Sequence, residues 1–117
     1  MEIRPDELLR LLSDGTRSRC LMLLLAEGEL CVCELTFALD DIQPKISRHL
    51  AVLRDARIVI DQRRGQWIYY RINPHLPGWA KELLTAVAKG VKHEKRYTDD
   101  HKKLRKMPNR PENRICA

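Results

Sequence analysis

Apolar residues recur with helical periodicity at the start of the chain. Pro5 opens a first predicted helix that runs to Ser13 with leucines along one side. Asp14 can cap a second helix, and Gly28 is placed to end it. The second helix is apolar nearly all round, so we expect it to be central and buried.

The pattern then changes from helices to strands and back. The predicted elements are a helix over about 33–39, a helix over about 44–55, strands over 58–63 and 66–72 joined by Arg64-Gly65, and a helix from about Pro77 to beyond Val91. The strand segments are rich in Ile, Val, Trp and Tyr, as a β-hairpin requires. The order ααααββα predicts a mainly α fold with a small β-hairpin, a winged helix-turn-helix.

The fourth helix would be the one that reads DNA. Its apolar residues Ile46, Leu50 and Leu53 share one face, which leaves polar side chains on the other. The candidate DNA contacts are Gln43, Lys45, Ser47, Arg48 and His49 at this helix, with Arg63 and Arg64 in the hairpin. For His49, a phosphate contact and a packed flanking position remain equal alternatives.

Charge is distributed unevenly along the chain. The net charge is +6, yet residues 1–42 carry four Arg/Lys against nine Asp/Glu, while residues 43–71 carry seven against two. The basic central block coincides with the predicted reading helix and hairpin, as a phosphate-facing surface would need. A second basic block closes the chain. We interpret residues 1–96 as a DNA-binding and dimerisation domain and residues 97–117 as a flexible basic tail.

Length and composition exclude several classes of protein. The 117 residues suit one domain, with no signal-peptide pattern and no apolar run long enough to span a membrane. We therefore expect a cytoplasmic protein with reduced thiols and no membrane partner. The sequence has no Gly-rich phosphate loop, paired carboxylates or nucleophile beside a base, so an enzyme is not indicated and no catalytic residue is assigned.

Four cysteines remain as candidate ligands. Cys31 and Cys33 form a Cys-x-Cys pair just ahead of the helix-turn-helix, whereas Cys20 falls in the buried second helix and is interpreted as a core residue. Thiols favour soft metals and metalloids. Residues two apart on a helix point about 200° away from each other. We therefore expect ligand binding to unwind the first turn of the third helix. We also expect its dipole to lower the thiol pKa values somewhat, against nearby glutamates.

Five short segments carry a family signature. They are 29–35 (ELCVCEL), 38–40 (ALD), 43–50 (QPKISRHL), Asp14-x-Thr16-Arg17 and Gly65-x-Trp67-x-x-Tyr70-Arg71. Together they resemble the ArsR/SmtB family of metal-responsive repressors, and most of all its arsenic-responsive branch. The resemblance covers about residues 5–90.

This resemblance implies a function and an effector. It implies a homodimeric repressor of its own operon that binds double-stranded operator DNA without a cofactor. As(III) or Sb(III) would be the inducer, held by Cys31 and Cys33. Members of this branch often have a third cysteine where this chain has Thr36. Cys116 is a candidate third ligand, and a cellular thiol or hydroxide is the alternative.

Two other functions stay open. A cadmium- or lead-responsive repressor of the same fold would also use Cys-x-Cys, although such sensors add cysteines near the N-terminus that are missing here. A metalloid-sequestering protein without DNA reading belongs to a different class, and the basic block argues against it. Dimerisation is expected through the first helix and an apolar stripe on the last. That stripe comprises Leu76, Ala80, Leu83, Leu84, Val87 and Val91.

Overall fold

The computed structural model describes residues 3–111. Its elements are α1 (Pro5–Leu12), α2 (Gly15–Glu27), β1 (Glu29–Cys31), α3 (Val32–Leu39), α4 (Gln43–Asp55), β2 (Val59–Arg64), β3 (Trp67–Ile72), α5 (Gly78–Gly90) and α6 (Lys95–Arg105). Within residues 3–111, no helix combines the length and the apolar character that crossing a membrane would require.

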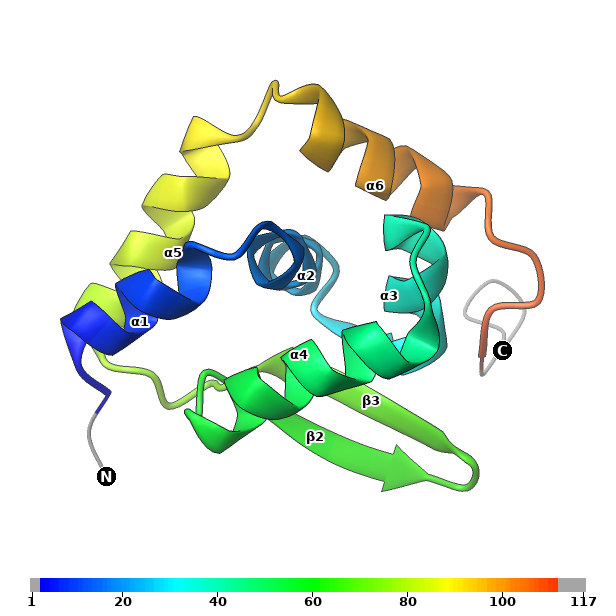
Figure 1. Cartoon of the computed structure of the whole chain (residues 1–117), viewed down its shortest axis with the longest axis horizontal. Helices are drawn as coiled ribbons and strands as arrows, with labels where there is room; N and C mark the ends of the chain where they lie inside the picture. The colour runs from blue at the N-terminus through cyan, green and yellow to red at the C-terminus, as the bar shows by residue number, and fades with distance from the viewer. Residues whose placement is uncertain (1–2, 112–117) are drawn as a thin grey trace.

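Helix α2 runs through the middle of the molecule, with the other helices arranged around it (Figure 1). Asp14 caps it as predicted, because the Asp14 carboxylate accepts the backbone N–H of Arg17 at 3.0 Å. Gly28 ends it with a φ of 90°, a conformation that favours glycine. Leu21 and Leu24 are fully buried, so the predicted central position is confirmed.

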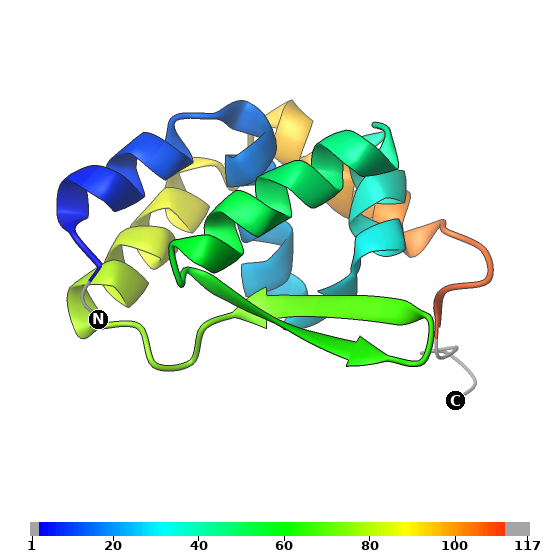
Figure 2. The ribbon, with the colours of Figure 1, turned by 60° about the horizontal axis from the view of Figure 1, so that its bottom comes forward.

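The helix-turn-helix and the hairpin form one connected unit. Figure 2 shows α4 lying along the β2–β3 hairpin, with α3 at one end of α4. The hairpin is predicted correctly to within a residue or two. The third strand, β1, is not predicted. It pairs antiparallel with β3 to give the sheet order β1-β3-β2, with Cys31 opposite Tyr69.

The end of the chain differs from the sequence-based prediction. The last predicted helix stops at Gly90, and α6 begins at Lys95, so a helix crosses the expected boundary at residue 96. Tyr97, Asp100 and Leu104 are buried against α2 and α3, which explains why residues 97–111 are not a flexible tail. Cys116 lies outside the described residues.

The apolar stripe of the last helix is also used differently. Leu76, Ala80 and Leu84 are buried within the subunit, and the other three members of the stripe pack partly against the same core. The expectation that the whole stripe is free for a partner is therefore wrong. Two large apolar side chains nevertheless stay exposed on neighbouring helices, Leu9 of α1 at 55% and Trp79 of α5 at 36% (Figure 1).

Candidate functional site

The two central cysteines meet at the junction of β1 and α3. Cys31 is the last residue of β1 and the N-cap of α3, with extended backbone at φ −78° and ψ 154°. Cys33 lies in the first turn of the helix, and the two Sγ atoms are 2.7 Å apart. Because Cys31 is outside the helix, the expected 200° separation does not apply. The thiols already converge, and no turn has to unwind before they can face one ligand.

The Cys31 sulfur also caps the helix. The backbone N–H of Cys33 donates to Cys31 Sγ at 3.3 Å, and the backbone N–H of Cys31 donates to Glu34 Oε1 at 2.8 Å. This reciprocal pair is a capping box in which cysteine takes the place of serine. Glu34 is not among the residues predicted for the site. The Cys-x-x-Glu spacing is the signal that could have found it.

Burial controls the chemistry of the pair. Cys31 is buried and Cys33 is partly exposed. Burial, followed by the hydrogen bond and charge of Cys31 and by the charge of Glu34, raises the pKa of Cys33 to about 12. The expectation of a lowered thiol pKa is therefore wrong for Cys33. A ligand must displace a proton from this thiol, so a strongly thiophilic ion is required.

One side of Cys33 opens onto a hollow of about 380 Å³ between α3 and α6. Its other lining residues are Thr36, Phe37, Asp40, Asp41, Gln43, Lys103 and Met107. Gln43 is the first residue of α4, so this hollow connects the thiol with the start of the predicted reading helix. Thr36, at the position where the family resemblance led us to look for a third cysteine, donates its hydroxyl to the Val32 carbonyl at 2.8 Å.

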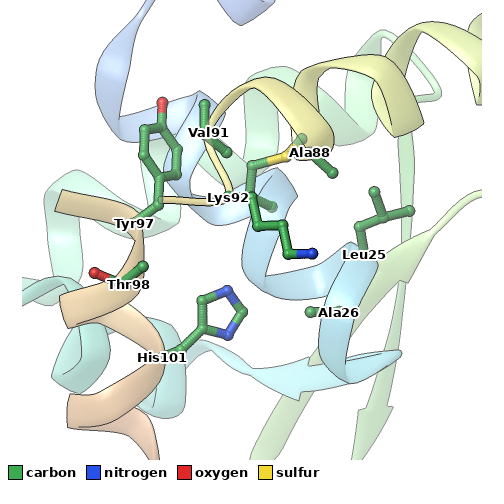
Figure 3. Close-up of a pocket in the computed structure, with 9 residues that line it drawn as sticks. Leu25, Ala26, Ala88, Val91, Lys92, Tyr97, Thr98 and His101 are labelled. Carbon is green, nitrogen blue, oxygen red and sulfur yellow. The ribbon is translucent and has the colours of Figure 1, made fainter. Parts of the chain in front are cut away.

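A second cavity of about 280 Å³ lies between α2, α5 and α6 (Figure 3). Lys92 and His101 point into it among apolar neighbours, but no cysteine lines it. Cys20 is fully buried elsewhere in α2, and burial raises its pKa to about 12, which fits the predicted core role. Among residues 3–111, no three Cys, His, Asp or Glu side chains gather as a metal site.

The outer face of α4 carries the predicted DNA contacts. Its apolar residues Ile46, Leu50 and Leu53 are buried, as expected. Gln43 and Arg48 are exposed, and Ser47 is half-buried. Lys45 is half-buried and pairs with Asp41 at 2.9 Å, which holds its ammonium beside the turn between α3 and α4.

His49 lies at the edge of this face. Its Nδ1 is 3.3 Å from Arg17 Nη1, so the ring packs against α2. Burial lowers the pKa of His49, and the positive charges of Arg17 and Arg48 add to this although Asp14 opposes it. These effects favour the neutral form of the ring. This environment matches the packed alternative, and a phosphate contact stays a prediction.

The two hairpin arginines are in different environments. Arg63 is exposed. Arg64 donates to Glu29 Oε2 at 2.9 Å and lies over the Tyr69 ring at 4.6 Å, so its guanidinium is held against the sheet. The Arg63 side chain is therefore more accessible to solvent than that of Arg64.

The chain has a winged helix-turn-helix, and a pair of thiols lies at the start of α3, the first helix of that motif. These features place it in the class of ligand-responsive transcriptional regulators. Residues 14–61 match the family model described as bacterial regulatory protein, arsR family. The chain is 47% identical over 109 residues to the arsenic resistance transcriptional regulator ArsR2 of Pseudomonas putida, and the match covers 93% of each protein. This chain belongs to the ArsR family of transcriptional regulators.

Other relatives and solved structures agree. The arsenic resistance transcriptional regulator ArsR1 of Pseudomonas putida is 45% identical over 98% of this chain and 89% of its own. The arsenical resistance operon repressor of Escherichia coli is 49% identical over 68% of each chain. The antimony-specific transcriptional repressor AntR superposes with a TM-score of 0.63 at 29% identity, over 77% of this chain and 84% of its own. The fold is thus that of winged-helix repressors.

Proposed function

We propose that the chain is an arsenite- or antimonite-responsive repressor that binds the operator of its own operon as a dimer and is released by the metalloid. The observation that carries this proposal is the convergence of the Cys31 and Cys33 sulfurs to 2.7 Å at the start of the helix-turn-helix. The names of the relatives support the arsenic and antimony response. The protein would act in the cytoplasm, where its thiols stay reduced.

The capping geometry supports a route from ligand to DNA. The same Cys31 sulfur that would hold the metalloid accepts the N–H of Cys33 and thereby caps α3. A metalloid bonded to that sulfur competes for its electron pairs, so α3 loses part of its cap. Since α3 packs directly on α4, a change at its first turn shifts the face that carries Arg48. Metalloid binding then lowers the affinity for DNA, and DNA binding lowers the affinity for metalloid by the same factor.

The donor set favours a trivalent metalloid. Two soft sulfurs suit arsenic and antimony, and the hollow beside Cys33 leaves room for a third substituent. Cadmium or lead is the alternative effector, because both ions also bind thiolates. A complete site for either would need more donors than the Cys31 and Cys33 thiols, and no group of three Cys, His, Asp or Glu side chains gathers within residues 3–111.

Dimerisation is proposed through α1 and α5. Leu9 and Trp79 are exposed on these adjacent helices, whereas Arg48 is exposed on the separate helix α4. A two-fold axis beside them would leave both copies of α4 free to enter successive major grooves, roughly 34–36 Å apart.

The test measures the release of labelled self-promoter DNA. Fluorescence anisotropy monitors this release while arsenite, antimonite or cadmium is added. Wild-type protein should bind and then be released by arsenite or antimonite. Cys31→Ser and Cys33→Ser should each bind DNA but resist release. Cys20→Ala is the matched control, since it removes a thiol outside the pair and should keep the response.

Three outcomes would contradict the proposal. A double Cys31→Ser, Cys33→Ser variant that arsenite releases as readily as wild type would show that the sensor lies elsewhere. A wild-type protein that binds arsenite but no promoter DNA would favour the sequestering function instead. Release by cadmium alone would identify the effector as a divalent soft metal.

A further inference from the structure

The segment that follows α6 returns to the start of α3. Figure 1 shows the chain leaving α6 and descending beside α3. Before this segment begins, Lys103 in the last turn of α6 pairs through Nζ with Asp40 Oδ1 at 3.2 Å, at the C-terminal end of α3. Arg110 Nε donates to Glu34 Oε2 at 2.6 Å near the other end. The chain from Lys103 to Arg110 thus spans α3 from its last turn to its first.

Arg110 meets a carboxylate that water does not reach. The Glu34 side chain is 0% exposed and that of Arg110 is 13% exposed. A buried carboxylate is stable only when a cation and hydrogen bonds compensate for its lost hydration. Arg110 supplies a positive charge for this purpose, from a position 76 residues away in the sequence.

The two oxygens of Glu34 connect Arg110 to the cysteine pair. Oε2 accepts from Arg110, while Oε1 accepts the backbone N–H of Cys31. Arg110 therefore holds the Glu34 carboxylate in place, and that carboxylate holds the backbone of Cys31. A residue that orients a ligand in this way usually affects metal affinity strongly without touching the metal.

We propose that Arg110 is a positioning residue of the Cys31–Cys33 site, acting through Glu34, so that the segment 107–111 is part of the sensor. This inference rests on the proposed function. Without Arg110, less positive charge compensates for the lost hydration of the buried Glu34 carboxylate beside the two cysteines. The carboxylate then turns toward water. The Cys31 N–H then loses its acceptor, and the buried Cys31 thiol becomes more accessible.

The experiment uses the full chain and two measurements. The first is the rate at which iodoacetamide alkylates Cys31 without metalloid or DNA, resolved for each cysteine by peptide mass spectrometry. The second is the affinity for arsenite without DNA. Arg110→Ala should speed alkylation of Cys31 and weaken arsenite binding by about 10-fold to 100-fold. Arg110→Lys should recover part of both, because an ammonium retains the charge.

Two controls separate positioning from a general loss of charge. Arg105→Ala removes an exposed arginine of α6 and should leave both measurements at the wild-type level. In a Glu34→Gln background, Arg110→Ala should add little further effect, because the charge that Arg110 compensates is gone. A merely structural role would instead give additive losses in the two variants.

Wild-type alkylation of Cys31 together with wild-type arsenite affinity in Arg110→Ala would overturn the proposal. If Arg110→Ala does not fold, Arg110→Lys and Glu34→Gln decide by the same measurements, and wild-type behaviour in both overturns it. Failure of the wild-type protein to bind arsenite would refute the proposed function. The alkylation rates of Cys31 would still decide the role of Arg110.

Discussion

A buried ion pair links α6 to α2. Asp100 of α6 is 3% exposed, and its two oxygens accept from Nη2 and Nε of Arg19 at 2.6 and 2.9 Å. Asp100→Ala would leave a largely buried guanidinium without its carboxylate. Breaking a buried pair in this way costs about 3–5 kcal/mol. Because Arg19 keeps 20% exposure and can turn toward water, we expect about 3 kcal/mol of lost unfolding free energy, the lower end of that range.

Urea unfolding at a fixed protein concentration measures this loss. With a slope of about 1–3 kcal/mol per molar urea, the midpoint should fall by about 1–3 M. Asp99→Ala is the matched control, since it removes the neighbouring carboxylate, whose pair with Lys95 is exposed to solvent. Its midpoint should stay close to that of the parent.

A double-mutant cycle tests the physical reason. Arg19→Ala combined with Asp100→Ala should cost less than the sum of the two single variants, because no charge is then left unpaired. The reasoning is refuted if Asp100→Ala and Asp99→Ala unfold at the same urea concentration. That result would mean that apolar packing alone holds α6 in place.

Three further predictions concern DNA, thiol reactivity and assembly. Arg48→Ala should weaken operator binding by about 1–3 kcal/mol without changing arsenite affinity. Arg54→Ala, near the C-terminal end of α4, should change operator binding less. Equal losses of operator binding in the two variants would contradict the assigned reading face. Alkylation of Cys33 should rise about tenfold per pH unit from pH 7 through 9 without levelling off, because its pKa is about 12, and a plateau near pH 9 would show an ordinary thiol. The double variant Leu9→Glu, Trp79→Glu should change from dimer to monomer in analytical ultracentrifugation, and its circular dichroism spectrum should stay unchanged. An unchanged mass would place the dimer interface elsewhere.

Elements with strong local signals are predictable from the amino-acid sequence. Asp14 and Gly28 determine the ends of α2 through side-chain capping and a left-handed backbone, and both effects act within a few residues. Pro44 likewise marks the first turn of α4. Because these signals do not depend on the rest of the fold, the residue pattern alone locates the helix-turn-helix.

Helix α6 was missed because its signal is not local. Charged residues dominate its sequence, which is typical of a solvated tail. Its buried positions Tyr97, Asp100 and Leu104 do follow helical spacing, but one of them is an aspartate. Arg19 on α2 makes burial of that aspartate favourable, and its contribution depends on tertiary contact.

The sequence indicates Cys31 and Cys33 as candidate ligands, but it does not predict how the two thiols are oriented. A Cys-x-Cys pair before a helix-turn-helix indicates soft ligands whatever its conformation. The relative direction of the thiols depends on Cys31 being the N-cap, which in turn depends on the three-residue strand β1. A strand this short has no periodicity to detect, and its pairing with β3 is a long-range contact.

The division of the pair between a strand and a helix bears on protein engineering. Cys31 is held by its pairing with Tyr69 across the sheet, whereas Cys33 is held by the first turn of α3. Grafting Cys-x-Cys onto the helix of an unrelated scaffold would point the sulfurs to opposite sides. A transplantable form of the proposed sensor must therefore include the strand, its sheet partner and the capping glutamate, so the smallest unit that keeps this thiol geometry is a piece of tertiary structure.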